Sequence, residues 1–176
     1  MGEYVTHLIE AAEIDRRLTE LAAEITRDYA GKTITAVCAQ KGAVILLADL
    51  TRKMEKHDIE FDFIDVSSYG DATESQGKVV LGNDMKMDAE GRHILIIEDI
   101  VDTGHTLVFL REHIAKKNPA SLKVCVLLDK PERRQAQGKL YDYAGFTIPD
   151  KFVVGYGLDY AQRYRHLPYI GVLNFE

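Results

Sequence analysis

The order of hydrophobic patterns along this chain predicts an α/β fold, with a parallel sheet covered by helices on both faces. Strand and helix patterns alternate, and several strand candidates are near-continuous apolar runs, which is typical of strands buried on both faces. A length of 176 residues, with 46% hydrophobic residues and no internal repeat, suits one core. We therefore expect residues 1–176 to form a single domain.

The N-terminal part of the chain supplies the first elements of this alternation. Residues 11–32 have the apolar spacing of an amphipathic helix, and Gly31 supplies a C-terminal stop. The apolar face of this helix comprises Ile14, Leu18, Leu21, Ala22 and Ile25. A β-branched strand is expected at residues 33–39, a second helix at 43–57 and an alternating strand at 59–69.

The middle of the chain continues the alternation after a polar interruption. Residues 70–78 lack large apolar side chains and are expected to form a mobile loop. Strands are expected at residues 78–84 and 91–99. Of all the expected strands, the one at 91–99 has the pattern most typical of a buried strand. A helix is expected at residues 106–117, because Asn118-Pro119 ends the pattern.

The C-terminal part of the chain contains one more apolar strand and then shorter elements. The strand is expected at residues 122–130. The basic segment 131–139 is interpreted as solvated surface, with a subunit interface as the second interpretation. Residues 146–173 are expected to form short strands and turns rather than a long helix.

The stretch ILIIEDIVDTGHT, residues 94–106, carries an unusual concentration of acids. An apolar strand delivers Glu98 and Asp99 to one tip, and Asp102 follows shortly after. Like charges at close quarters raise the free energy of the fold unless a cation, a proton or a ligand compensates them. In parallel sheets ligands bind beyond the carboxyl ends of the strands, which is where this stretch ends. Residues 40–42, residues 68–69 and Lys130 are expected around the same rim.

Several interpretations of this stretch compete. It could be a solvated turn whose acids favour the start of a helix. A nucleoside triphosphatase would need a phosphate-binding loop, and the only candidate, residues 26–33, has Thr26 in place of the first glycine. A phosphoaspartate hydrolase would need two acids separated by one residue, whereas Asp99 and Asp102 are separated by two. A dinucleotide fold is excluded because residues 155–161 contain a lone G-x-G.

The remaining interpretation is a site for a phosphorylated sugar. The sequence DTGHT opens a helix, so free N–H groups and the helix dipole face the turn. Gly104 permits close approach of a phosphate, and Thr103 and Thr106 add hydroxyl groups. The two acids upstream suit a vicinal diol, or a metal ion with its waters, beside that phosphate.

The bulk composition excludes other partners. The net charge of -6 gives no basic surface of the kind that duplex nucleic acids need, so no nucleic-acid partner is expected. No stretch approaches the length of a membrane-spanning apolar helix, so no membrane partner is expected. Cys38 and Cys125 each lie within an apolar run and are expected to be reduced core residues of a cytoplasmic protein.

The motifs together resemble a known family. The stretch ILIIEDIVDTGHTL resembles the 5-phosphoribosyl-1-pyrophosphate (PRPP) signature of type I phosphoribosyltransferases. The stretches LLDKP and IPDKFVVGYGLDY resemble the hypoxanthine-guanine members of that family. This resemblance implies the type I phosphoribosyltransferase fold, a central, mostly parallel twisted sheet flanked by helices. It also implies a core at about residues 30–140 and a small hood formed by residues of about 1–15 and 141–176.

The resemblance also implies roles for residues on the PRPP side of the site. Glu98 and Asp99 would hold the ribose 2′ and 3′ hydroxyls, directly or through Mg²⁺. The turn that binds the 5′-phosphate would comprise Asp102, Thr103, Gly104, His105 and Thr106. Asp102 would be the catalytic acid/base at purine N7. His105 stands where the family often has a lysine, and its N–H can still serve the phosphate.

Further roles concern the purine and the pyrophosphate. Lys130 would donate to the purine 6-oxo group, Phe152 would stack on the ring, and the Val153 main chain would meet the exocyclic edge of the base. Asp159 would lie at the purine site and help to bind a second Mg²⁺ that carries pyrophosphate. Arg165 would bind pyrophosphate.

Two more segments match the family pattern. Lys41 and Gly42 match the pyrophosphate loop, where a cis peptide is usual. Gln40 stands before them in place of a common aliphatic residue, so the sequence leaves the geometry of this peptide open. Ser68 and Tyr69 match the start of a mobile loop that closes over the reacting centre.

The activity implied by the resemblance is purine salvage. The phosphoribosyl group of PRPP would pass to N9 of hypoxanthine or guanine, giving IMP or GMP and pyrophosphate. The alternatives are a regulator that senses PRPP or nucleotides without catalysis, and a phosphoribosyltransferase that prefers xanthine. A homodimer or homotetramer is expected, and the sequence does not separate these two states.

Overall fold

The computed structural model describes residues 2–69 and 78–176. The stretch expected to be a mobile loop therefore falls almost entirely outside the described residues. Ser68 and Tyr69 are described only as the last positions of a strand.

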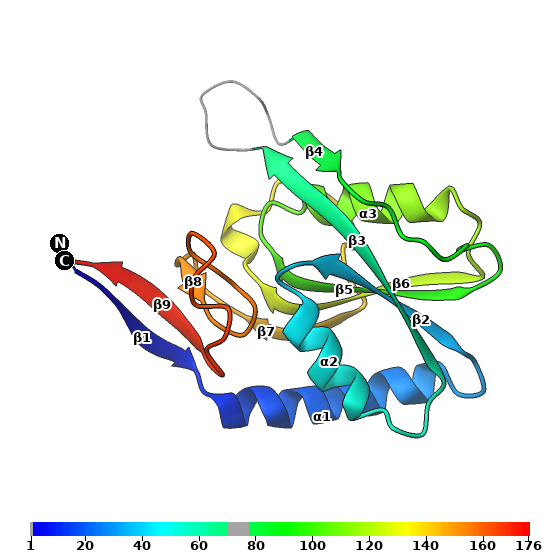
Figure 1. The fold of residues 1–176 in the computed structure, drawn as a ribbon, viewed down its shortest axis with the longest axis horizontal. Helices are drawn as coiled ribbons and strands as arrows, with labels where there is room; N and C mark the ends of the chain where they lie inside the picture. The colour runs from blue at the N-terminus through cyan, green and yellow to red at the C-terminus, as the bar shows by residue number, and fades with distance from the viewer. Residues whose placement is uncertain (1, 70–77) are drawn as a thin grey trace.

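A six-stranded sheet forms the centre of the molecule, and the expected α/β class is confirmed (Figure 1). In spatial order its strands are β4 (Lys78–Leu81), β3 (Ile59–Tyr69), β2 (Ile34–Gln40), β5 (His93–Val101), β6 (Ser121–Asp129) and β7 (Tyr143–Thr147). The pairs from β3 through β7 are all parallel, and β4 pairs with β3 antiparallel. The carboxyl ends of β2, β5 and β6 therefore meet at one edge of the sheet.

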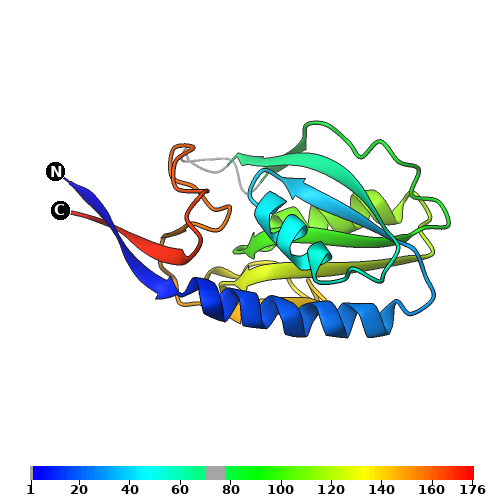
Figure 2. The same cartoon turned by 60° about the horizontal axis from the view of Figure 1, so that its bottom comes forward.

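Helices cover both faces of this sheet. Helix α1 (Ala11–Asp28) and helix α2 (Val44–Arg52) pack on one face, and helix α3 (His105–Ala115) packs on the other. The buried residues of α1 are those predicted from the apolar spacing. Figure 2 shows α1 running along the whole underside of the sheet. None of the described helices is long and apolar enough to cross a membrane.

Helix α2 ends earlier than the pattern predicted, because residues 53–57 form turns. The N–H groups of Lys53, Met54 and His57 each donate to the carbonyl three residues earlier, which closes tight turns instead of continuing the helix. The Thr51 hydroxyl also donates to the Leu47 carbonyl at 2.6 Å, a contact that competes with the regular helical bond at its last turn. Met54 fits the apolar spacing of a helix because its side chain is buried in the core, although the residue itself lies in a turn.

A second, three-stranded antiparallel sheet lies at the end of the molecule. Strand β9 (Ile170–Phe175) pairs with β1 (Glu3–Ile9) on one side and with β8 (Val153–Val154) on the other. Figures 1 and 2 both show β1 and β9 extending together away from the core, with the two termini at their far end. We call this sheet the hood. The sequence patterns did not predict β1.

The end of the core sheet that is remote from these termini contains a polar cluster around Asp28. The Tyr143 hydroxyl donates to Asp28 Oδ2 at 2.5 Å, and Lys123 Nζ lies 3.4 Å from the same oxygen. The hydrogen bond from Tyr143 is the main reason why the pKa of Asp28 lies below its ordinary value of 3.8; Lys123 adds to the effect, and partial burial opposes it. The cluster ties the end of α1 to β6 and β7.

We expect Tyr143→Phe to reduce the free energy of unfolding at neutral pH and to reduce it less in acid. Because the folded-state pKa of Asp28 is depressed, its stabilisation is present above the unfolded-state pKa and is lost as the pH falls through the folded-state pKa. Urea unfolding of both proteins at about pH 7 and about pH 3 measures this difference. Asp15→Asn is the control, because the exposed Asp15–Lys53 pair contributes little. An equal loss at both pH values would contradict the role of Asp28.

Candidate active site

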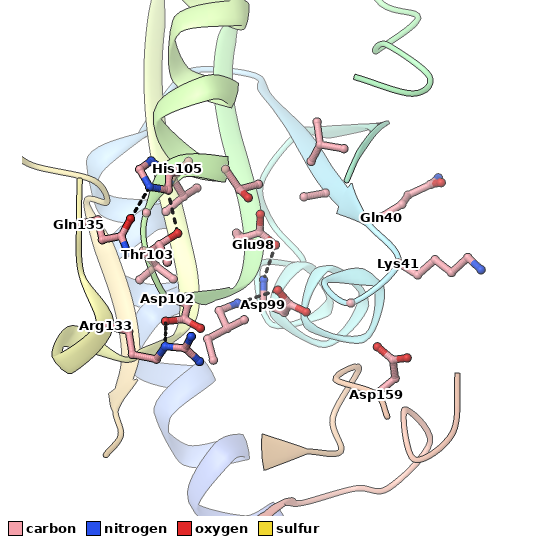
Figure 3. A pocket seen from close by; sticks show the side chains of 18 of the residues that line it. Gln40, Lys41, Glu98, Asp99, Asp102, Thr103, His105, Arg133, Gln135 and Asp159 are labelled. Carbon is pink, nitrogen blue, oxygen red and sulfur yellow. Dashed lines mark hydrogen bonds and ion pairs between the residues drawn. The ribbon is translucent and has the colours of Figure 1, made fainter. Parts of the chain in front are cut away.

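A cleft of about 870 Å³ opens at the carboxyl ends of β2 and β5, beside the hood. Its walls come from the end of β2, the end of β5, the turn that leads into α3, and the segments at residues 133–135 and 152–165 (Figure 3). Predicted site residues that line it are Lys41, Gly42, Glu98, Asp99, Asp102, Thr103, Gly104, His105, Thr106, Phe152, Asp159 and Arg165. The fold thus brings most of the predicted residues to one place.

Glu98 and Asp99 form an acidic pair in this cleft. Glu98 is buried, and its Oε1 accepts a hydrogen bond from the Asp99 N–H at 3.0 Å. Burial, and next the charge of Asp99, raise the pKa of Glu98 well above its ordinary value. Burial also raises the pKa of Asp99, although the hydrogen bond to Glu98 and the nearby Arg165 oppose this rise. A cation or hydroxyl donors from a ligand would therefore stabilise the charged pair.

Gly42 allows the segment after β2 to lie against this pair. A Cβ atom at Gly42 would stand 1.7 Å from Asp99 Oδ2, so a larger residue would displace that carboxylate. The Gln40–Lys41 peptide, whose geometry the sequence left open, is cis. In Figure 3 the Lys41 side chain is directed away from the acidic pair.

Residues 102–106, which we call the β5–α3 turn, surround the start of α3. Gly104 has φ 91° and ψ -6°, a left-handed conformation that favours glycine. A Cβ atom there would lie 2.6 Å from Leu140 Cδ1 and 2.8 Å from Ala136 Cβ, so the close packing also requires glycine. The first N–H groups of a helix have no partner within the helix, and its N-terminal end carries partial positive charge. The turn therefore offers hydrogen-bond donors to an anion in the cleft.

Asp102 has a cation on either side. Lys130 Nζ lies 3.9 Å from Asp102 Oδ2, and Arg133 Nε lies 3.7 Å from Oδ1. Oδ1 is buried, yet it accepts no hydrogen bond from any residue that the structure describes. A buried acceptor usually has a partner, so this oxygen is available to a donor on a ligand.

Arg165 and Asp159 approach the acidic pair from the hood side. Arg165 Nη2 lies 2.9 Å from Asp159 Oδ1, and Arg165 Nη1 donates to the Gly157 carbonyl at 2.6 Å. Asp159 Oδ2 accepts the Gln162 N–H at 2.8 Å. A Cβ atom at Gly157 would lie 2.0 Å from the Gly42 carbonyl oxygen, so the two main chains are in direct contact. The loop after β8 and the segment after β2 are therefore packed directly against each other.

Of the three residues predicted to contact a purine, one is exposed in the cleft and two are buried. The Phe152 ring lines the cleft, is 53% exposed and meets the Tyr160 ring edge-on, at 5.8 Å between centroids. Lys130 and Val153 are buried and are not among the described residues that line the cleft. The Lys130 ammonium lies between Asp102 and Asp150, 3.7 Å from Asp150 Oδ1. The Phe152 ring is thus partly exposed at the cleft, and the Lys130 ammonium lies beside Asp102, which lines it.

Residues 131–139 are mostly exposed, as expected for solvated surface, but two of them also belong to the cleft. Arg133 and Gln135 line the cleft, and Gln135 Oε1 is 2.9 Å from His105 Nε2. Residues 131–133 form a short 3₁₀ helix that turns the chain back towards the β5–α3 turn. Sequence reasoning missed these contacts because they depend on β6 lying beside β5. The signal that could have found them is the position of this segment directly after a strand that ends at the ligand-binding edge.

Three acidic residues provide oxygen donors for a metal ion, although they do not complete a site by themselves. Among residues 2–69 and 78–176, no group of three or more His, Cys, Asp or Glu side chains is arranged to hold a metal. The available donors of Glu98, Asp99 and Asp159 are all oxygens, which is the donor type that Mg²⁺ prefers. Mg²⁺ commonly completes its octahedron with water and substrate oxygens. The raised pKa of Glu98 marks a place where added positive charge would be favourable.

Comparison with known proteins places the chain in a family. The family model described as "Phosphoribosyl transferase domain" matches residues 6–161. The hypoxanthine-guanine phosphoribosyltransferase of Bacillus subtilis is 49% identical over 166 residues, covering 94% of this chain and 91% of that protein. The Streptococcus pneumoniae protein of the same name is 47% identical over 169 residues, covering 96% of this chain and 93% of its own length.

A solved structure agrees with the sequence comparison. The crystal structure of a Bacillus anthracis hypoxanthine-guanine phosphoribosyltransferase has a TM-score of 0.90 and 40% identity, covering 99% of this chain and 100% of that one. The match includes both the core and the hood segments. The chain therefore belongs to the phosphoribosyltransferase family, and within it to the hypoxanthine-guanine phosphoribosyltransferases.

Proposed function

We propose that this enzyme transfers the 5-phosphoribosyl group of PRPP to N9 of hypoxanthine and guanine, releasing pyrophosphate and forming IMP and GMP. The observation that carries this proposal is the combination, in one cleft, of the acidic pair with a donor-rich turn at the start of α3. The two features match the two ends of a ribose 5-phosphate. The match to family members of this name supports the choice of purine.

PRPP would bind along the edge of the sheet. The N–H groups of the β5–α3 turn would hold the 5′-phosphate, with the hydroxyls of Thr103 and Thr106 as further donors. Glu98 and Asp99 would accept from the ribose hydroxyls or hold a metal ion there. Lys41, Gly42 and Arg165 would face the pyrophosphate.

The chemical step would break the bond between C1′ and the pyrophosphate oxygen and form the bond between C1′ and N9. Positive charge develops on the sugar in such a transition state, as in glycoside chemistry. Asp102 Oδ1, which accepts no hydrogen bond from the described residues, would accept the proton from purine N7, and this makes N9 a better nucleophile. Phe152 would stack on the base, and Lys130 with the Val153 main chain would meet its exocyclic groups.

A divalent cation fits the donors of this site, and we propose that it is Mg²⁺. Glu98 and Asp99 would hold one ion beside the ribose, and Asp159 would help to hold a second ion that carries pyrophosphate. When bound, Mg²⁺ supplies positive charge that neutralises the leaving pyrophosphate. The ion pair with Arg165 would keep Asp159 oriented towards the pyrophosphate side.

We expect Asp159→Asn to raise the Mg²⁺ concentration needed for half-maximal activity by roughly tenfold, the scale on which supporting residues tune metal affinity. The asparagine oxygen can still accept the Gln162 N–H, so the local turn should persist. Titrating Mg²⁺ at saturating PRPP and purine measures the shift. Glu132→Gln is the control, because it is exposed in the 3₁₀ helix. An unchanged Mg²⁺ dependence in Asp159→Asn would restrict Asp159 to a structural role.

A single assay tests the proposed activity. Pyrophosphate release is measured with PRPP and, in turn, hypoxanthine, guanine, xanthine and adenine, with and without a chelator of divalent cations. We expect pyrophosphate release with hypoxanthine and with guanine. We expect no release with any base when the chelator is present. Release only with xanthine would support the alternative substrate, and binding of PRPP without any release would support a regulator.

The remaining features of the proposal concern assembly and location. We propose a homodimer or homotetramer acting in the cytoplasm, with residues 1–176 forming one domain. The exposed Phe61 and Phe63 on β3 support an interface, because large apolar side chains gathered on a surface often mark one. Cys38 and Cys125 are free, which fits a reducing compartment. Light scattering at several protein concentrations tests the assembly.

A further inference from the structure

The carbonyl oxygens around the β5–α3 turn are bound by the segment that follows β6. Lys130 N donates to the Val101 carbonyl at 2.9 Å. The N–H groups of Gln135 and Ala136 both donate to the Thr103 carbonyl at 3.0 Å. A carbonyl oxygen would repel an anion, so these bonds keep the acceptors of the turn away from the side on which a phosphate would bind.

The carbonyl between them, that of Asp102, is bound by a side chain. Arg134 Nε donates to the Asp102 carbonyl at 3.0 Å, and Arg134 Nη2 pairs with Asp129 Oδ1. The Tyr141 hydroxyl donates to Asp129 Oδ2 at 2.6 Å. One guanidinium therefore connects the main chain of Asp102 to a carboxylate whose two oxygens both have partners.

This carboxylate is a fixed point in the fold. Asp129 is 6% exposed, is the last residue of β6 and lies in register opposite Val101 of β5. A buried carboxylate is costly without partners, which explains the guanidinium and the phenol around it. The five donors of a guanidinium lie in one rigid plane, so its two contacts have a fixed relative geometry. Arg134 thus holds the Asp102 carbonyl at a defined position relative to the sheet.

The orientation of that carbonyl sets the orientation of two groups in the cleft, the Thr103 N–H and the Asp102 carboxylate. The peptide unit is planar, so the direction of the Asp102 carbonyl also sets the direction of the Thr103 N–H. It also limits the rotation of the Asp102 backbone, from which the carboxylate projects towards the cleft. Lys130 and Arg133 contact that carboxylate only at 3.9 and 3.7 Å, beyond hydrogen-bond length, so they do not fix it.

We propose that Arg134 is a positioning residue, which ties the Asp102 main chain to Asp129 and thereby holds the Asp102 carboxylate where it can take the purine proton. This inference rests on the proposed function, in which Asp102 is the acid/base. Asp129 and Tyr141 act through Arg134 and contact no substrate. Misplacement of a reacting group by about 1 Å can lower a rate by about 10²-fold, so such a link has a measurable effect.

The test is a double-mutant cycle between Arg134→Lys and Asp102→Asn. A lysine keeps the positive charge next to Asp129, but a single ammonium cannot reproduce the planar contact with both partners. We expect Arg134→Lys to lower kcat by about tenfold or more in the wild-type background. In the Asp102→Asn background the same change should lower kcat by less than about twofold, because the carboxylate that it positions is already absent. Circular dichroism and thermal melts confirm that each variant is folded.

Further variants separate positioning from stability. Tyr141→Phe removes one donor to Asp129 and should lower kcat by a smaller factor, about threefold, with the same dependence on background. It also replaces Arg134→Lys in the cycle if the lysine variant does not fold. Lys139→Ala is the matched control, because Lys139 pairs with Asp142 at 2.9 Å in the same connection, is 72% exposed and does not contact the turn. It should leave kcat unchanged.

Two failures would be distinguishable. No pyrophosphate release by the wild type with hypoxanthine or guanine would contradict the proposed function itself. An active wild type in which Arg134→Lys lowers kcat by the same factor in both backgrounds, or leaves kcat unchanged, would overturn only the positioning role. A loss of thermal stability with unchanged kcat would also overturn it, because that is the signature of a purely structural residue.

Discussion

Replacing Asp102 by asparagine should lower the turnover number by about 10²-fold while leaving the affinity for PRPP close to that of the wild type. General acid–base help contributes on this scale. Asparagine has nearly the same shape, so the neighbouring main-chain contacts should persist, but it cannot take a proton at N7. The 5′-phosphate would still be held by N–H groups of the β5–α3 turn, which the substitution does not remove.

Steady-state pyrophosphate release and PRPP binding together measure this split between turnover and affinity. Single-turnover experiments show whether chemistry is the slow step in the variant, which the interpretation requires. Asp88→Asn is the matched control, because Asp88 is exposed in the connection between β4 and β5. Near-wild-type turnover of Asp102→Asn, with chemistry as the slow step, would remove Asp102 from the acid/base role.

The sequence predicted most of the elements of the core because their burial has a simple period. Helix α1 buries the side chains at Ile14, Leu18 and Leu21, whose spacing is three or four residues. Strand β5 is buried on both faces and is therefore a continuous apolar run. The cleft follows from the same pattern, because the carboxyl ends of parallel strands lie at one edge. The residues of the β5–α3 turn could be placed there without knowing any distance.

The hood could not be predicted in the same way. In strand β1 only Ile9 is buried, and its partner β9 lies at the other end of the chain, with Glu3 opposite Phe175. Its stability depends on that pairing rather than on a local pattern. The role of residues 131–136 was also missed, because their polar side chains are equally compatible with solvent and with an active site. Only the adjacency of β5 and β6 brings Arg134 to the Asp102 carbonyl.

Lys130 should restrict the enzyme to purines with a 6-oxo group. Its ammonium has three donors and no acceptor, and its two carboxylate neighbours lie at 3.9 and 3.7 Å, so no short hydrogen bond to them occupies those donors. Hypoxanthine and guanine present an acceptor at position 6, whereas adenine presents a donor amino group. Two donors facing each other leave a buried charge unsatisfied, at a cost of about 1–3 kcal/mol or more.

We expect kcat/KM for adenine to be at least ~10²-fold below that for hypoxanthine, the scale on which a polar pocket rejects a ligand that cannot bond to it. Lys130→Met should lower kcat/KM for hypoxanthine and guanine together, by roughly 10- to 100-fold, because it removes a charged hydrogen bond of about 1.5–3 kcal/mol but keeps the side-chain volume. PRPP affinity should remain near wild type. The N–H groups of the β5–α3 turn would hold the 5′-phosphate, and Lys130 is not among the described residues that line the cleft there. Lys151→Met, an exposed neighbour in the same region, is the matched control. Wild-type efficiency with adenine comparable to that with hypoxanthine would disprove the role of Lys130. An ammonium that only donates cannot bond equally well to the 6-oxo acceptor of hypoxanthine and to the 6-amino donor of adenine.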